Sequence, residues 1–290
     1  MNKKDKPSIG VIYFQHNHAA SDELLIKLLE QKVNVDRLPL EEQIDFKEIK
    51  QKTENCKVIF NNTTWSPILV ESLELSKTLE ELGKKVIDSS HSFFYQEDKW
   101  MFYLKCLEHR LPTPKTYLVI KETRFNSKLI KDILETKPLI LKAIFSDNGE
   151  CVEKANDYQD FLKKLNKLSK KASFSPIIAQ EFVPNYGRSY RVTLINHKVC
   201  QAVVKIGNSW KQTGNEKKAC SRKVKVTPKL KKLCERASKV FGMEVCGIDL
   251  VLHNGKWSLI EVNSCPDLGF VCTDEKRLTQ VLVNYLCSIN

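Results

Sequence analysis

Long apolar runs are absent from this 290-residue chain. No segment reaches the roughly 18 apolar residues that a membrane-spanning helix needs, and the longest apolar segments, residues 9–14 and 137–145, have the length of strands. The charged residues 1–7 lead directly into the first of these segments, without the apolar stretch of a secretory signal. We therefore expect no membrane segment and no export, and we expect the protein in the cytoplasm.

Closely spaced cysteine pairs are absent as well. The ten Cys residues stand singly and no Cys-x-x-Cys occurs, so the sequence encodes neither a zinc ribbon nor a thioredoxin-like redox motif. Reduced, mostly buried thiols in a reducing compartment are the simplest interpretation.

Acidic residues are fewer than basic residues. Lys and Arg number 47 against 35 Asp and Glu, and the basic excess is concentrated in residues 163–171 and 211–232. This excess attracts anions, and nucleotide phosphates, a polycarboxylate, an acidic protein tail and nucleic acid all fit it.

The N-terminal region also lacks the glycine-rich fingerprint of a dinucleotide site. Residues 1–94 nevertheless alternate strand and helix signals, which predicts a small doubly wound α/β domain. Its first strand ends in His16 and His18, which fit either a metal pair or loop histidines at a switch point of the sheet. The predicted elements are strands 8–14, 57–61 and 84–88 and helices 21–31 and 67–82, the second helix ended by Gly83.

Two further domains follow, and no internal repeat is present. Residues 95–176 predict a small α+β unit, and residues 177–290 predict a largely antiparallel unit that ends in a helix. In the first unit we expect helices 98–109, 126–135 and 156–171 and strands 116–120, 138–145 and 150–153. In the second we expect strands 177–183, 189–195 and 198–204, helix 228–241, two strands around Asn254-Gly255 and helix 275–288.

Three polar side chains interrupt the apolar strands of the last hairpin: Asp249, Glu261 and Asn263. Oxygen ligands of this kind suit Mg²⁺ together with substrate phosphates, whereas pairing of each acid with a surface lysine is the structural alternative. A two-residue turn would pair residue 249 with 260 and put Asp249 on the opposite face from Glu261. A three-residue loop, residues 253–255, pairs 249 with 259 and restores a common face, so the sequence predicts that loop.

Cations and polar groups also stand inside apolar strands further upstream. Lys142 lies in the apolar run 138–145 and needs an anion, and the turn 146–150 that follows can fold over phosphates with its backbone N–H groups. Gln180 and Glu181 end the next strand. Arg191 lies on the strand after that, where it can clamp a carboxylate or phosphate or pair with Glu181.

Together with Lys99, these residues resemble the ATP-grasp fold and, within it, the RimK type of glutamate ligases. The resemblance covers about residues 97–268, and the preceding α/β unit is similar to the domain that usually comes before an ATP-grasp module. It implies a fold class of an N-terminal doubly wound α/β unit followed by a two-subdomain ATP-grasp module, with 95–176 as the small lid subdomain and 177–290 as the core subdomain that carries the metal site.

The resemblance also implies roles for individual residues. Lys99 and Lys142 would hold ATP phosphates, residues 180–183 (Gln180, Glu181, Phe182 and Val183) would line the adenine pocket, and Arg191 would face an acyl phosphate as the catalytic residue. Asp249, Glu261 and Asn263 would hold two Mg²⁺ (or Mn²⁺) ions. Gly149, Ser189 and Lys211 complete the expected ATP-binding set.

The sequence departs from the family pattern in the phosphate loop. Ser146 and Cys151 stand at two positions where glycine is usual, and only Gly149 remains. Ser189 replaces the Asp that commonly precedes the Arg, and Lys211 is the one position that keeps its expected charge in a divergent substrate segment. We therefore expect an intact metal site with an acceptor other than the standard one.

The main hypothesis is a Mg-ATP-dependent carboxylate–amine ligase that forms an amide through an acyl phosphate, with glutamate or another amino acid as the amine. The expected partners are a small carboxylate and an amine, or an acidic peptide or protein tail; membranes and nucleic acid are disfavoured, and a homo-oligomer stays open. The alternatives are an ATP-grasp kinase of a small phosphorylated acceptor such as an inositol phosphate, and a basic nucleic-acid or protein-binding module without catalysis. Specificity is expected in loops 15–18, 61–66 and 205–222.

Overall fold

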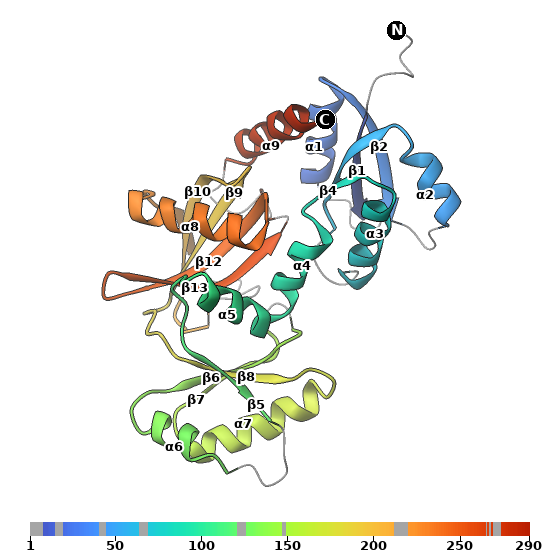
Figure 1. The fold of residues 1–290 in the computed structure, drawn as a ribbon. Helices are drawn as coiled ribbons and strands as arrows, with labels where there is room; N and C mark the ends of the chain where they lie inside the picture. The colour runs from blue at the N-terminus through green and yellow to red at the C-terminus, as the bar shows by residue number, and fades with distance from the viewer. Residues whose placement is uncertain are drawn as a thin grey trace.

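The computed structural model describes residues 8–14, 20–40, 45–63, 69–120, 126–146, 149–211, 220–264, 266, 268 and 274–290. Three β-sheets organise this part of the chain, and Figure 1 shows them as an N-terminal unit, a central core and a small separate unit. Every described helix is too short or too polar to span a bilayer. His16 and His18 lie outside the described residues.

The N-terminal sheet is parallel, with the strand order β2-β1-β3-β4. This confirms the expected α/β unit, and the glycine at position 83 ends α3 in the left-handed conformation, as predicted. The edge strand β2 and the short helix α2 were not predicted. The strands are β1 (Ser8–Phe14), β2 (Asn34–Leu40), β3 (Cys56–Asn61) and β4 (Lys85–Ile87), and the helices are α1 (Ala20–Glu30), α2 (Phe46–Lys52) and α3 (Leu69–Glu81).

The small unit is a four-stranded antiparallel sheet in the order β5-β8-β6-β7, with α7 packed on one face. Strand β8 pairs on both sides within this sheet, so the boundary expected before residue 177 is corrected: the small unit continues through Glu181. The elements are β5 (Thr116–Val119), α6 (Lys128–Leu134), β6 (Leu139–Ala143), β7 (Val152–Ala155), α7 (Tyr158–Lys171) and β8 (Ile177–Glu181).

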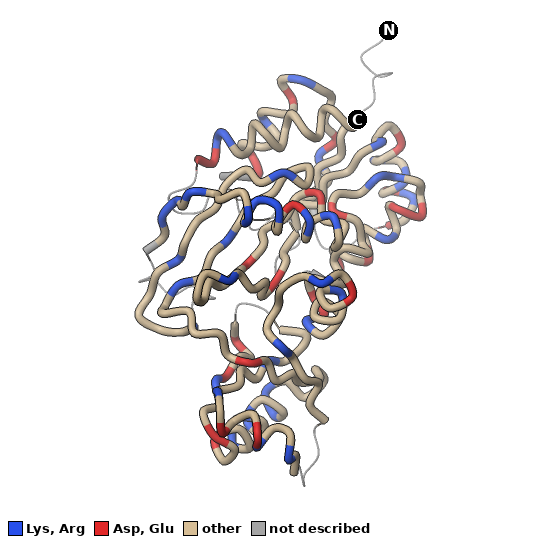
Figure 2. Tube along the Cα trace, turned by 60° about the vertical axis from the view of Figure 1, so that its left-hand side comes forward, with Lys and Arg blue, Asp and Glu red and all other residues tan. Residues whose placement is uncertain are grey.

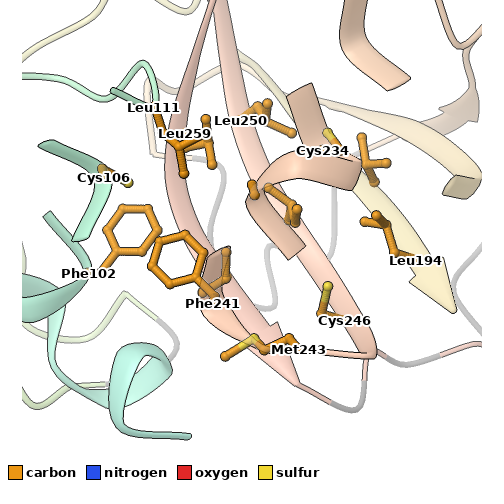
Figure 3. Packing of buried hydrophobic residues seen from close by; sticks show 14 of the residues in the cluster. Phe102, Cys106, Leu111, Leu194, Cys234, Phe241, Met243, Cys246, Leu250 and Leu259 are labelled. Atoms are coloured by element: carbon orange, nitrogen blue, oxygen red, sulfur yellow. The ribbon is translucent and has the colours of Figure 1, made fainter. Parts of the chain in front are cut away.

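The core is a five-stranded antiparallel sheet in the order β11-β10-β9-β12-β13. Helices α5 and α8 cover one face, where Phe102 stacks on Phe241 with ring centroids 5.1 Å apart (Figure 3). Helix α5 therefore belongs to the core, not to the small unit as the boundary at residue 95 predicted. The elements are α4 (Ser90–Glu97), α5 (Lys99–Glu108), β9 (Arg188–Ile195), β10 (Lys198–Ile206), β11 (Cys220–Lys223), α8 (Pro228–Phe241), β12 (Val245–His253), β13 (Lys256–Ser264) and α9 (Glu275–Ile289).

The turn of the last hairpin differs from the prediction. His253 pairs with Lys256, so the loop has two residues, Asn254 and Gly255, both with positive φ as a tight hairpin turn requires. The three-residue loop is therefore wrong. A register shift between Leu250↔Leu259 and Asp249↔Glu261 leaves Ile260 as the extra residue of a β-bulge, and this bulge brings Glu261 opposite Asp249.

The described thiols are free, as expected from their spacing. Cys106, Cys234 and Cys246 are buried in the core, and burial raises the pKa of the Cys106 and Cys234 thiols to about 12. A thiol that stays protonated in an apolar core is a packing group and a poor nucleophile.

A buried carboxyl group joins the N-terminal unit to the core. Asp88 follows β4, and its Oδ1 accepts hydrogen bonds from the backbone N–H of Glu244 (2.6 Å) and of Val245 (3.1 Å), at the start of β12. Its Oδ2 is buried without a partner among the described residues. Burial raises the pKa of Asp88 to about 8, so the protonated form predominates at neutral pH.

This raised pKa predicts a pH-dependent stability. The folded state holds a proton on Asp88 that the unfolded state releases between about pH 4 and pH 8, so wild-type stability falls as pH rises through this window, by at most about 1.4 kcal/mol per pH unit. Asp88→Asn keeps an oxygen acceptor and removes the ionisation. We expect its free energy of unfolding, measured in urea, to rise relative to wild type from pH 5 to pH 8.

The exposed Asp132 of α6 provides the matched control, because Asp132→Asn should leave the wild-type pH profile unchanged. Parallel pH profiles for wild type and Asp88→Asn would contradict the assignment.

Candidate functional site

A cavity of about 320 Å³ is lined by residues of the small sheet and of the core sheet. All thirteen predicted site residues line it, although they come from six elements and the segments between them. They are Lys99, Lys142, Gly149, Gln180, Glu181, Phe182, Val183, Ser189, Arg191, Lys211, Asp249, Glu261 and Asn263.

The three expected metal ligands share one face of the core sheet. Asp249 pairs directly with Glu261 across β12 and β13, and Asn263 lies two residues further along β13. Burial raises the pKa of Glu261, and the charge of Asp249 adds to this effect. The Nδ2 atom of Asn263 is buried without a partner among the described residues.

This donor set fits a divalent cation that also binds phosphate. The described residues contain no cluster of three or more His, Cys, Asp and Glu, so the site has two carboxylates and an amide and no closed protein cage. Mg²⁺ is usually held by one or two carboxylates while waters and substrate phosphates complete its coordination. The two facing carboxylates, one with its pKa raised, are a pair that a bound cation would stabilise.

Arg191 binds the carboxylate of Asp249 through two hydrogen bonds. Its Nε donates to Oδ1 at 2.7 Å and its second terminal nitrogen donates to Oδ2 at 2.6 Å, and the two residues are direct neighbours across β9 and β12. The suggested pairing of Arg191 with Glu181 is wrong, because Glu181 accepts from Lys137 at 3.0 Å. Pairing of Asp249 with a surface lysine is also excluded. A cation at Asp249 would have to share its oxygens with Arg191 or displace it.

Two lysines approach the cavity from opposite sides. The Lys142 ammonium donates to Gln180 Oε1 at 2.8 Å, and burial lowers its pKa to about 8, so it is still mostly charged at neutral pH. Lys99, the first residue of α5, donates to the carbonyls of Ile144 (3.0 Å) and Ser146. Lys99 therefore ties the core to the end of strand β6.

The strand-to-hinge segment is held by its backbone. The N–H of Glu181 donates to Lys115 O at 2.8 Å and the N–H of Phe182 donates to Pro138 O at 3.0 Å. The carboxylate of Glu181 binds Lys137, and this residue also lines the cavity. The Lys154 ammonium lies 3.8 Å from the centre of the Phe182 ring.

Residues 96–284 match the family of RimK-like ATP-grasp domains. The chain belongs to this family. It is thus an ATP-dependent ligase of the carboxylate–amine class, with the fold that the sequence predicted.

Two named relatives support this membership. A coenzyme gamma-F420-2:alpha-L-glutamate ligase of Methanococcus maripaludis is 27% identical over 226 residues, which cover 74% of this chain and 76% of the relative. A beta-citrylglutamate synthase B of Homo sapiens is 24% identical over 223 residues, which cover 73% of this chain and 55% of the relative.

Solved structures share the fold at low sequence identity. The D-alanine–D-alanine ligase of Bacillus anthracis complexed with ATP has a TM-score of 0.71 at 13% identity, and each chain is covered to 98%. The ATP-grasp ligase PsnB, complexed with a phosphomimetic precursor variant, Mg and ADP, has a TM-score of 0.69 at 15% identity, again with 98% of each chain covered.

In the turn that the sequence analysis predicted as the phosphate loop, Ser146 and Cys151 stand at the two positions where glycine was expected. Ser146 Oγ donates to Ala143 O at 3.0 Å, and Cys151 is buried in the apolar core of the small unit. Gly149 keeps the positive φ of 68° that other residues rarely adopt. Residues 147 and 148 lie outside the described residues.

Three further residues that line the cavity were not predicted individually: Asn185, and Lys205 and Trp210, which the sequence analysis included only within the specificity loop 205–222. Asn185 Nδ2 donates to Trp210 O at 2.7 Å, and Trp210 meets Phe182 edge to face. The signal for Lys205 was present, since it follows the apolar run of β10 as Lys142 interrupts that of β6. Asn185 and Trp210 left no such signal, because their roles depend on the packing of two loops.

The loop after β8 and the loop after β10 meet at Gly187. A Cβ at this position would lie 2.1 Å from Gly207 O, and φ is +69°. Gly83 has a similar φ of +75° with no atom within 4 Å of such a Cβ. Alanine substitutions at these two glycines therefore distinguish the cost of a left-handed backbone, which both share, from the cost of a steric clash, which only Gly187 has.

We expect Gly83→Ala to lower the free energy of unfolding by about 1 kcal/mol, the usual cost of a left-handed alanine. Gly187→Ala should cost about 2–4 kcal/mol, because the 207 carbonyl must also move. Urea denaturation of both variants measures the difference. Equal losses would show that the two loops do not pack as described.

Proposed function

We propose that this ligase activates a carboxylate with Mg-ATP as an acyl phosphate and joins it to an amine, with glutamate or another amino acid as the amine. The observation that carries the proposal is that Arg191, Asp249 and Glu261 are direct cross-strand neighbours on β9, β12 and β13. This pairing puts an anion-binding guanidinium beside two facing carboxylates. Lys99 and Lys142 line the same cavity.

ATP would lie between the small sheet and the core sheet. Residues 180–183 would contact the adenine, chiefly through backbone groups, because the Glu181 carboxylate is engaged by Lys137. Lys99, Lys142 and Gly149 would hold the phosphates. Ser189 and Lys211 would complete the nucleotide site from the core side.

Asp249, Glu261 and Asn263 would hold Mg²⁺ or Mn²⁺, with two ions per site. When bound, these ions would neutralise charge on the transferring phosphoryl group. A cation that displaces Arg191 from an Asp249 oxygen would free the guanidinium to bind the acceptor carboxylate near the γ-phosphate.

The chemistry then runs in two steps. An oxygen of the acceptor carboxylate forms a bond to the γ-phosphorus while the bond to the ADP oxygen breaks. The amine attacks the acyl carbon, phosphate leaves with the carboxylate oxygen, and the amine loses a proton. No protein nucleophile is required, so positioning and charge stabilisation carry the catalysis.

The expected partners are small carboxylate and amine substrates, or an acidic peptide. The names of the two relatives support glutamate as the amine, and the precursor peptide in another PsnB complex supports a peptide acceptor. The surplus of cations at the cavity favours one other candidate, a kinase of a phosphorylated acceptor such as an inositol phosphate.

The test measures ADP and inorganic phosphate separately, across a matrix of carboxylates and amines with Mg-ATP. We expect equal amounts of both products, each requiring an acid and an amine, and at least a hundredfold loss in Asp249→Asn/Glu261→Gln because its metal ligands are weakened. With an ¹⁸O-labelled acid, one label should appear in the phosphate.

Asp274→Asn is the matched control, because Asp274 is an exposed carboxylate that caps α9 and Asn caps helices equally well. ADP without phosphate would replace the ligase by the kinase. No turnover of any pair, together with salt-sensitive binding of nucleic acid, would favour the binding module.

A further inference from the structure

One cation of the cavity, Lys205, has no role in the proposed ATP, metal and acceptor contacts. Five cations line the cavity, from both sheets: Lys99, Lys142, Arg191, Lys205 and Lys211. Lys99 and Lys142 contact the small sheet, where the phosphate loop lies. Arg191 and Lys205 project from the core sheet, on the side where the acceptor would bind.

The strand register defines how Lys205 lies relative to Arg191. Arg191 pairs directly with Val203, so Lys205, two residues along β10, is its diagonal neighbour on the same face, at about 7–8 Å. Lys205 pairs directly with Ser189, which also lines the cavity. The Lys205 ammonium and the Ser189 hydroxyl therefore belong to the cross-strand pair next to Arg191 on the same face of the sheet.

The surrounding strands add no competing negative charge. The sequences of β9, β10 and β11 contain no Asp or Glu, and Figure 2 marks Lys and Arg positions at several points along the trace of the central core. Of the cavity's acids, Glu181 binds Lys137, Asp249 binds Arg191, and Glu261 lies on β13, three strands away from Lys205. Lys205 therefore has no acidic residue on its own strand or on the two strands beside it.

We propose that Lys205, beside the nucleotide-site residue Ser189, forms a second anion subsite, which binds a carboxylate of the acceptor other than the one that is activated. Arg191 then holds the reacting carboxylate, and Lys205 the second one, so acceptors with two carboxylates are selected over those with one. This proposal rests on the proposed function for the identity of the acceptor site.

Two sources can supply a second carboxylate, a small dicarboxylic acid or an acidic peptide. A substitution of Lys223 can distinguish these two sources. It lies on the edge strand β11, pairs with Val203 and so shares the face of Arg191, but it stands two strands away and is exposed. A peptide that extends toward the sheet edge reaches Lys223, whereas a short dicarboxylate does not.

The experiment is equilibrium titration calorimetry with the full chain loaded with Mg²⁺ and a non-hydrolysable ATP analogue. Butyrate, glutarate and the peptide Glu-Glu-Glu are the probes. We expect wild type to bind glutarate about tenfold more tightly than butyrate, because an ammonium–carboxylate hydrogen bond is added. Lys205→Met should reduce this preference to less than twofold, and Lys205→Arg should retain most of it.

Lys229→Met is the matched control, since Lys229 is an exposed lysine of α8, which covers the opposite face of the sheet. Its preference should equal that of wild type. Equal binding of glutarate and butyrate to wild type, no binding of any probe, or an unchanged preference in a folded Lys205→Met would each overturn the proposal.

Lys223→Met identifies the source. A loss of about threefold or more for Glu-Glu-Glu alone indicates a peptide acceptor, and no loss for either probe indicates a small dicarboxylate; both results retain the Lys205 subsite. Because the titration requires no turnover, its failure is distinct from a failure of ADP release, which tests the ligase itself.

Discussion

The pairing register between β12 and β13 determines the whole site. Strand side chains alternate between the two faces, so a slip of one residue would move Glu261 to the face packed by Phe102 and Phe241. A carboxylate without a partner in that apolar layer would cost several kcal/mol. The bulge at Ile260 avoids this cost by leaving both Ile260 and Glu261 on the cavity wall.

Once the register is set, the charges of the site balance one another in the absence of ligand. Two facing carboxylates repel, and Arg191 compensates by binding both oxygens of Asp249. Lys99 and Lys142 lower the pKa of Glu261 against the effect of burial. A metal ion and phosphates would therefore exchange existing contacts for new ones, so the desolvation of these charges is largely complete before a ligand binds.

Strong local signals made much of this structure predictable. Helix α8 has a threonine N-cap, Pro at its first position and a left-handed Gly242 after its last, and its predicted bounds match the structure. The need for a shared face correctly predicted that Asp249 and Glu261 lie together. The predicted three-residue loop was wrong, because a two-residue turn and a β-bulge bring them together instead. Asn254-Gly255 is a strong two-residue turn signal, and nothing in the residues around Ile260 marks a bulge.

Other elements were missed because their residues have weak intrinsic preferences and tertiary contacts decide. Strand β2 contains Asp36, Arg37 and Pro39, which sequence patterns read as a loop, and its place at the sheet edge tolerates them. The domain boundary before residue 177 was wrong because strand β8 pairs with β5 and β6 and so belongs to the small sheet. Single-strand periodicity carries no information about which sheet a strand joins.

The contacts across the cavity suggest how the glycine-poor phosphate loop still serves an ATP site. Lys99 reaches from the core to the carbonyls of Ile144 and Ser146, and Lys211 reaches from the other side to Val152 O at 3.4 Å. Both contacts join cations to neutral carbonyls, which bind a cation less strongly than phosphate oxygens do. Phosphates would therefore draw the same lysines away from the backbone. In the proposed site, cations from both sides of the cavity would thus hold the phosphates, and this role is compatible with side-chain anchors at Ser146 and Cys151.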